Sequence, residues 1–286
     1  MAAGRCEEKM GVKLRNSIAV ALSPLKSESI GSLTFFGSGS LFDRKEGTMS
    51  YLFQAFGGST VLVDCGPLVF DKLHGLNVWK KIGAIVLTSS EESSMGSLAS
   101  VVKMMQMVTD KPTHIICMMH VGLHAHDYLV NANNIPKESL EFHAIRPTDH
   151  DVELECTPSI RYTFRKTSDT SSISIMEVVN KTGSICMLHS GMIDRPAFEV
   201  LAEQEKAPVL SVMRRNPENT IVLHSASFKD RKGNCQFDKL LEWNAIYKNF
   251  LLFGHSFEEG NNINFSQRYM SSLSTKTDNV LLIEKQ

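Results

Sequence analysis

The densest group of ligand-type side chains lies in the segment His120-Val121-Gly122-Leu123-His124-Ala125-His126-Asp127. On a helix, His120 and His124 would lie one turn apart on one face, a spacing that can bind a metal ion. However, Gly122 weakens that helix, and His126 and Asp127 would point in other directions. Zinc proteases have a glutamate between the two histidines of such a pair, and this segment has none. The pattern therefore favours a surface or interface helix, with a metal site as the alternative.

Three more histidines follow short apolar runs: His189, His224 and His255. We interpret His189 and His224 as residues that end buried strands. The adjacent Glu91 and Glu92 indicate a solvated loop rather than a pair of catalytic acids. The chain contains neither a Gly-x-Ser-x-Gly elbow nor a P-loop, so no short motif indicates a serine nucleophile or a phosphate cradle.

The elements that must position these groups follow from the hydrophobic pattern. Short apolar runs bounded by turn residues predict strands, and apolar residues at helical spacing predict helices over 96–108, 195–204 and 237–247. Segments 167–172 and 256–264 are expected to be exposed loops. The predicted strands are 32–36, 51–56, 60–64, 84–87, 114–119, 160–164, 172–179, 184–188, 220–224, 250–253 and 279–284.

Each half of the chain begins with several strands and continues with strand–helix units. Two sheets packed face to face, with helices outside, would satisfy this α/β pattern. We expect residues 1–30 to form an N-terminal extension that includes a first strand, and residues 31–286 to form a single domain.

Composition excludes several classes of function. The net charge is −1, with 30 basic and 31 acidic residues, so there is no overall electrostatic attraction to nucleic acids or membranes, and only a local basic patch stays open as a route to such binding. No apolar run approaches the roughly 20 residues needed to span a bilayer, and the charged first fifteen residues do not form a secretory signal. The six cysteines form no CxxC pair, which is typical of reduced thiols in a cytoplasmic protein.

Three stretches together point to a family. They are Phe36-Gly37-Ser38-Gly39-Ser40, Val61-Leu62-Val63-Asp64-Cys65-Gly66, and Thr88-Ser89-Ser90-Glu91-Glu92-Ser93-Ser94-Met95-Gly96-Ser97-Leu98. Their order and spacing resemble the metallo-β-lactamase superfamily, particularly its ribonuclease Z and phosphodiesterase branches. The resemblance implies a four-layer αββα sandwich of two mixed sheets with outer helices.

The third stretch departs from the family at its metal ligands. The family motif reads Thr-His-x-His-x-Asp-His-x-Gly-Gly-Leu, and Thr88, Gly96 and Leu98 keep its frame. Serines and a glutamate replace the four ligands, and a neutral hydroxyl is a poor substitute for the imidazole or carboxylate donors that zinc needs. The replaced positions are Ser89, Glu91, Ser93 and Ser94.

Later family motifs can also be followed. Met192 stands where the Ser-Gly-Asp turn has its bridging aspartate, and Ser225 replaces the acid of a His-Glu strand end that keeps His224. The last metal histidine is retained as His255. The resemblance implies a vestigial cleft without a bound metal or cofactor, lined by Ser89, Glu91, Ser93, Ser94, Met192, His224 and His255.

These substitutions predict a non-catalytic binding or scaffold subunit. By analogy with inactive partners in the family, it would form a homodimer, or a heterodimer with an active relative, and its cleft would take a nucleotide or RNA phosphate. Two alternatives remain open. One is a metal-dependent hydrolase or phosphodiesterase with a site rebuilt from Glu91, His224 and His255, and the other is a protein that sequesters a signalling nucleotide.

Overall fold

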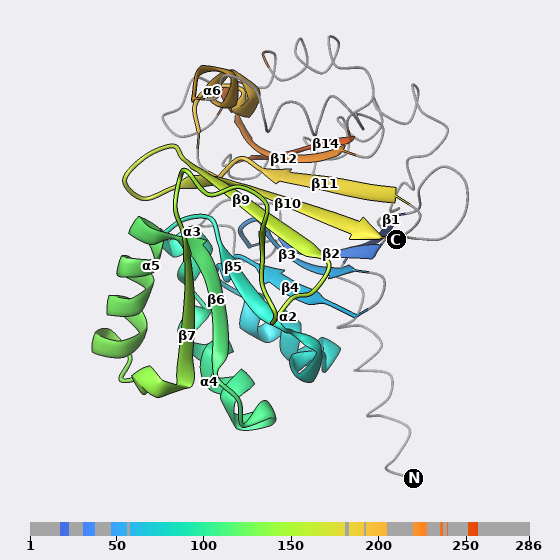
Figure 1. The fold of residues 1–286 in the computed structure, drawn as a ribbon. Coiled ribbons are helices and arrows are strands. Elements are labelled where there is room, and N and C mark those ends of the chain that lie inside the picture. Colours follow the sequence, from blue (N-terminus) through green and yellow to red (C-terminus); the bar gives the residue numbers. More distant parts are fainter. Residues whose placement is uncertain are drawn as a thin grey trace.

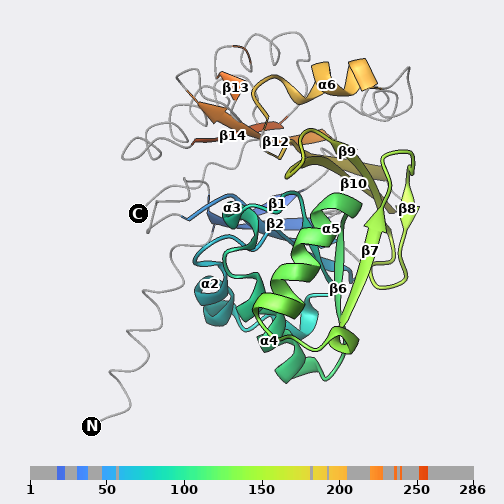
Figure 2. The same cartoon turned by 90° about the vertical axis from the view of Figure 1, so that its left-hand side faces the viewer.

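The computed structural model describes residues 18–22, 31–37, 47–55, 58–180, 183–191, 193–204, 220–227, 235, 236, 239 and 251–256. Figures 1 and 2 show that these residues form four layers, with two facing sheets between outer helices. Within them, no helix has both the length and the apolar composition needed to cross a lipid bilayer.

The first sheet has seven strands that lie in chain order. Its first four strands are antiparallel neighbours, and the strands from β4 onward are parallel. Within the parallel part, β4 and β5 are short and almost wholly apolar because both of their faces are covered. The strands are β1 (Ile18–Leu22), β2 (Gly31–Gly37), β3 (Ser50–Ala55), β4 (Thr60–Val63), β5 (Ala84–Leu87), β6 (Thr113–Met118) and β7 (Leu140–Ile145).

Helices cover the outer face of the first sheet (Figure 2). In α4 (Leu98–Thr109), Leu98, Val101, Val102 and Met105 recur at helical spacing and are buried. The other helices on this side are α2 (Val69–Leu76), η2 (Trp79–Lys81), α3 (Glu92–Met95), α5 (Met119–His126), η3 (Asp127–Ala132) and η4 (Lys137–Ser139).

The second sheet carries α6 (Ala197–Gln204) on its outer side (Figure 1). Its order is β13-β12-β11-β10-β9-β8, and β14 also pairs with β12. Pairing is antiparallel from β8 to β11 and parallel from β11 onward. The strands are β8 (Val152–Glu153), β9 (Ile160–Lys166), β10 (Ser172–Asn180), β11 (Gly183–His189), β12 (Thr220–Ser227), β13 (Cys235–Gln236) and β14 (Leu251–Ser256).

Two apolar cores hold the layers together. One lies between the sheets and includes Tyr51, Phe53, Tyr162, Phe164 and Leu223. The other lies beneath the helices of the first sheet. The described cysteines Cys65, Cys117, Cys156, Cys186 and Cys235 are all free thiols.

The α/β architecture of two mixed sheets with outer helices agrees with the sequence prediction. Within residues 1–30, the structure places β1, which pairs with β2 and so belongs to the first sheet. The helix predicted over 195–204 is α6, whereas the helix over 237–247 and the strand over 279–284 lie outside the described residues, apart from residue 239.

One expectation was wrong. The predicted exposed loop 167–172 is exposed only at Ser168 and Asp169, while Ser171 and Ser172 are completely buried. The predicted loop over 256–264 lies outside the described residues, apart from Ser256, the last residue of β14.

Candidate functional site

The segment that resembles the metal motif follows β5 directly, at the carboxyl end of the parallel strands. The Thr88 N–H and hydroxyl donate hydrogen bonds to the two carboxylate oxygens of Asp64, at 2.9 Å and 2.6 Å. Ser89 is completely buried, and its hydroxyl oxygen accepts the Glu91 N–H at 3.1 Å. Ser94 is also buried, and its carbonyl accepts the Cys65 N–H at 2.7 Å. Residues 88–94, which we call the motif loop, are therefore bonded tightly to the end of β4.

The connection between β9 and β10 covers the motif loop. The Ser172 N–H and hydroxyl both donate to the Thr88 carbonyl, at 2.8 Å and 3.0 Å. The Ser90 N–H donates to the Thr170 carbonyl at 2.8 Å, and Ser89 and Ser171 form an antiparallel bridge. Residues 167–171, which we call the hairpin loop, therefore continue the second sheet onto the motif loop.

Glu91 and Glu92 differ in environment. The half-buried Glu91 accepts a hydrogen bond from the Thr170 hydroxyl at 3.0 Å, so it is fixed to the hairpin loop. Glu92 is exposed and begins α3. The expected solvated loop is therefore found only at Glu92, and the two carboxylates do not form an acid pair.

A buried acid and a buried imidazole face each other beside the motif loop. The His189 Nδ1 lies 3.9 Å from the Asp64 carboxylate, and both side chains are 3 % exposed. Burial raises the pKa of Asp64 to about 7, although hydrogen bonds from Thr88 and Ser94 oppose this shift. Burial, and after it the neighbouring His224, lowers the pKa of His189 to about 3. Near neutral pH, His189 is therefore uncharged.

His224 does not end its strand, because β12 continues to Ser227. Its Nε2 accepts the Ala197 N–H at 3.0 Å, so the ring proton of the neutral imidazole lies on Nδ1. Ala197 is the first residue of α6, whose opening N–H groups have no partner inside the helix. His224 thus caps α6, and its Nε2 lone pair is already in use.

The remaining predicted site residues are distributed as follows. Ser93 is half-buried, and its carbonyl accepts the Thr48 hydroxyl at 2.6 Å. The backbone of His255 lies level with Ser225 in the β12–β14 pair. Met192 lies outside the described residues. The structure thus brings Ser89, Glu91, Ser93 and Ser94 together on the motif loop and directs His224 toward α6.

The histidine-rich segment does form a helix, as predicted for its surface or interface interpretation. His120 is half-buried, and its pKa is lowered by burial and then by the charge of Lys166. His124 is exposed, and the ring of His126 lies 5.7 Å from that of Phe142. In the part of the chain that the structure describes, these histidines are not among three or more ligand-type residues that could surround one ion.

The described residues do not fit the pair of metal ions that the family motif would hold. Among the motif positions, only Glu91 carries a zinc-type donor, and the Thr170 hydroxyl is bonded to it. The Nε2 of His224 is bonded to the backbone of α6. Sequence reasoning placed Asp64 in the family frame but did not recognise its contact with His189. The signal for this contact was a polar residue at the end of each of two buried strands.

Neither the models of known families nor the curated proteins match this sequence. Solved structures do match its fold. The metallo-beta-lactamase fold protein YhfI from Bacillus subtilis is 17% identical with a TM-score of 0.57, covering 83% of this chain and 92% of that one. Long-form RNase Z from yeast is 12% identical with a TM-score of 0.59, covering 79% and 37%. A diphosphatase of the PhnP family is 14% identical with a TM-score of 0.54, covering 79% and 87%. At these identities the likeness is one of fold, and the chain has the metallo-β-lactamase fold.

Proposed function

We propose that this chain is a non-catalytic protein of the metallo-β-lactamase fold that acts as a binding or scaffold subunit. The observation that carries the proposal is the closure of the motif loop by the hairpin loop. Ser172 and Thr170 bond to the backbone of Thr88 and Ser90, so these groups of the motif loop are already bonded within the protein. A substrate entering at this place would have to displace these hydrogen bonds.

The partner in this proposal is a second copy of the chain or an active relative, in the cytoplasm. Free thiols at all five described cysteines support a reducing compartment. The large apolar side chains that are most exposed in the described residues are Met107, Met119 and Leu123. Met119 and Leu123 lie one turn apart on α5 and would supply apolar contact area to a partner.

A nucleotide or RNA phosphate is the weaker candidate partner. The Ser89 hydroxyl is buried and already bonded to the Glu91 N–H, and Ser94 is buried beside Asp64. The helix that follows, α3, has only four residues and so provides no extended N-terminal dipole. These observations support a protein partner over a phosphate ligand. They also weigh against the sequestration of a signalling nucleotide.

The native mass of the purified full-length chain tests the scaffold proposal. We expect a dimer that Leu123→Glu weakens, because a charge at the centre of an apolar contact must be desolvated. Lys103→Glu on α4 is the matched surface control and should leave the mass unchanged. A monomer that also fails to bind the chain's metallo-β-lactamase-fold relatives from its own proteome would contradict the proposal. Calorimetry against a nucleotide panel should show no heat of binding.

A hydrolysis assay separates this function from the rebuilt hydrolase. The chain is incubated with bis(p-nitrophenyl) phosphate and Zn²⁺ or Mn²⁺, alongside His255→Ala and Glu91→Gln variants. We expect the same background rate for all three proteins. Metal-stimulated turnover that His255→Ala abolishes, and that a control substitution at the exposed His74 preserves, would replace the scaffold proposal with the hydrolase.

A further inference from the structure

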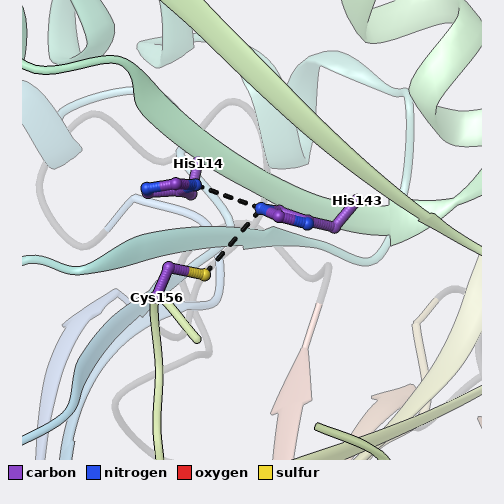
Figure 3. A group of neighbouring side chains, drawn as sticks. All are labelled: His114, His143 and Cys156. Atoms are coloured by element: carbon purple, nitrogen blue, oxygen red, sulfur yellow. Dashed lines mark hydrogen bonds between the residues drawn. The ribbon is translucent and has the colours of Figure 1, made fainter. Parts of the chain in front are cut away.

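A second group of ligand-type side chains lies away from the motif loop, between the first sheet and the connection from β8 to β9 (Figure 3). His114 is the second residue of β6, at the end of the strand opposite to the motif loop. His143 and Glu141 lie on β7, and Cys156 lies in the connection between β8 and β9 of the second sheet. None of these residues contributes to the site described above.

Strand register explains how the sheet residues meet. His114 is level with Glu141, and Ile116 is level with His143, in the parallel pair of β6 and β7. Because alternate residues of a strand share a face, His114, Glu141 and His143 all lie on the face that carries Ile116. Ile116 belongs to the core between the sheets. The two histidines are half-buried at the margin of that core.

The separations of the donor atoms are close to those around one tetrahedral zinc ion. Zinc bonds of about 2.0–2.3 Å place tetrahedral ligand atoms roughly 3.3–3.8 Å apart. His114 Nδ1 lies 3.1 Å from His143 Nε2, and His143 Nε2 lies 3.8 Å from Cys156 Sγ. These three donor atoms all lie within 4.8 Å of one another. The exposed Glu141 carboxylate lies beside them, with one oxygen 3.3 Å from His114 Nδ1 and the other 3.6 Å from His143 Nε2. Figure 3 shows the two imidazoles and the thiol converging on one point.

The segment that carries Cys156 is already held in place. The Thr157 N–H donates to the Leu154 carbonyl at 3.0 Å, and the Tyr162 hydroxyl donates to the Thr157 hydroxyl at 2.9 Å. Tyr162 is itself fully buried in the core between the sheets. A ligand that is fixed before the ion arrives loses little conformational entropy on binding.

The pKa shifts of His143 and Cys156 affect metal binding in opposite senses. Burial lowers the pKa of His143, which favours the neutral imidazole that binds metals. Burial raises the pKa of the Cys156 thiol, so this thiol keeps its proton until a metal displaces it. Binding of a divalent ion should therefore release one proton from Cys156.

We propose that His114, His143 and Cys156 bind one structural zinc ion, with the neighbouring Glu141 as its fourth ligand, and that this ion ties β6 and β7 to the β8–β9 connection of the second sheet. If one Glu141 oxygen turns onto the ion, two imidazoles, a thiolate and a carboxylate supply four ligands and leave no open position, as in structural zinc sites. Mixed nitrogen and sulfur donors select zinc over magnesium or calcium. This site is independent of the proposed scaffold function.

The test uses the full-length chain, stripped with a chelator and reloaded with Zn²⁺ or Co²⁺. We expect one equivalent of metal by elemental analysis and, with Co²⁺, an intense near-ultraviolet band from thiolate-to-cobalt charge transfer. Cys156→Ser should abolish that band. His143→Asn should weaken zinc binding by about 100-fold or more, because even the loss of a residue that only supports a ligand weakens binding by about 10–100-fold.

Matched controls locate the ion. Glu155→Gln changes an exposed carboxylate next to Cys156, and Glu91→Gln changes the carboxylate of the motif loop. Both variants should keep the metal and the cobalt band. Circular dichroism of the metal-free proteins checks that each variant is folded. A wild-type chain that takes up no metal, or a Cys156→Ser variant with an unchanged cobalt band, would overturn the proposal. Loss of the metal only in Glu91→Gln would place the ion at the motif loop, which would also contradict the scaffold function.

Discussion

At the scale of single residues, folding raises the pKa of Asp64 and lowers the pKa of His189. The raised pKa of Asp64 means that the folded chain holds a proton that the unfolded chain loses above about pH 4. The lowered pKa of His189 means that the folded chain excludes a proton that the unfolded chain holds below about pH 6.5. Between these values the two effects cancel, so the pair gives little pH dependence to stability.

Replacing one residue of the pair should reveal the pH dependence that the other residue gives to stability. In Asp64→Asn, His189 remains, and the free energy of unfolding should fall by about 1.4 kcal/mol per pH unit as pH drops below about 6.5. In His189→Gln, Asp64 remains, and stability should fall at a similar slope as pH rises from about 4 to about 7. Urea unfolding at a series of pH values measures both. Two variants whose curves run parallel to that of the wild type would show that the pair is not coupled to folding in this way.

His224 gives a second prediction at this scale. His224→Ala leaves the buried Ala197 N–H without its acceptor, and we expect a loss of stability of about 1–3 kcal/mol. In His224→Gln, a side-chain oxygen can take the place of Nε2 and should restore part of this loss. Chemical denaturation of both variants provides the measurement. Equal destabilisation by alanine and glutamine would mean that the ring is needed for its volume rather than as an acceptor.

At the scale of elements, the turn after β11 and the hairpin loop depend on one glycine. Gly191 has a φ of +61°, and a Cβ there would lie 2.5 Å from the Ser172 carbonyl and 2.6 Å from the Ser171 hydroxyl. Both neighbours are completely buried. Any side chain at position 191 would therefore push the hairpin loop away from the motif loop.

Gly191→Ala should destabilise the protein by about 1–3 kcal/mol or more, because it combines an unfavourable φ with a clash against backbone. Gly75→Ala is the matched control. Gly75 lies in α2, and a Cβ added there would have no neighbouring atom within 4 Å. Alanine at this position should therefore stabilise the helix by about 0.5–1 kcal/mol. Denaturant unfolding compares the two. The explanation fails if both substitutions shift stability in the same direction.

The elements themselves were largely predictable. Apolar runs such as 84–87 and the helical spacing of Leu98, Val101, Val102 and Met105 locate β5 and α4, because local patterns determine them. The hairpin loop was not predictable in the same way. Ser171 and Ser172 have the composition of an exposed loop, and their partners Ser89 and Thr88 lie more than 80 residues earlier in the chain.

The two candidate sites also differ in how far the sequence could predict them. The motif loop could be located because its ligand positions follow one another in sequence. By contrast, His114, His143 and Cys156 are separated by 29 and 13 residues and share no local motif. The register of β6 against β7 brings the two histidines together, and register depends on the assembled sheet. Cys156 reaches them from the β8–β9 connection, where it packs against the core between the sheets.

At the scale of the whole molecule, the proposed zinc ion would join the two sheets. It should stabilise the folded chain by about 2.7 kcal/mol when free zinc is 100 times its dissociation constant. Differential scanning fluorimetry with added zinc or chelator should therefore show a higher melting temperature with the metal. Cys156→Ser should lose only this zinc-dependent increment, while Glu155→Gln should keep it. A melting temperature that does not respond to zinc in the wild type would contradict a structural role for the ion.

The hydrogen bonds that close the motif loop also determine how a hydrolase could be rebuilt on this chain. Three of them join backbone or hydroxyl groups of residues 170–172 to backbone atoms of Thr88 and Ser90, so they do not depend on which side chains occupy positions 89 and 91. Histidines introduced at these two positions would meet Ser171 and Thr170 rather than open space. An engineer seeking metal-dependent activity would need to shorten or redirect the β9–β10 connection first and replace the ligands second.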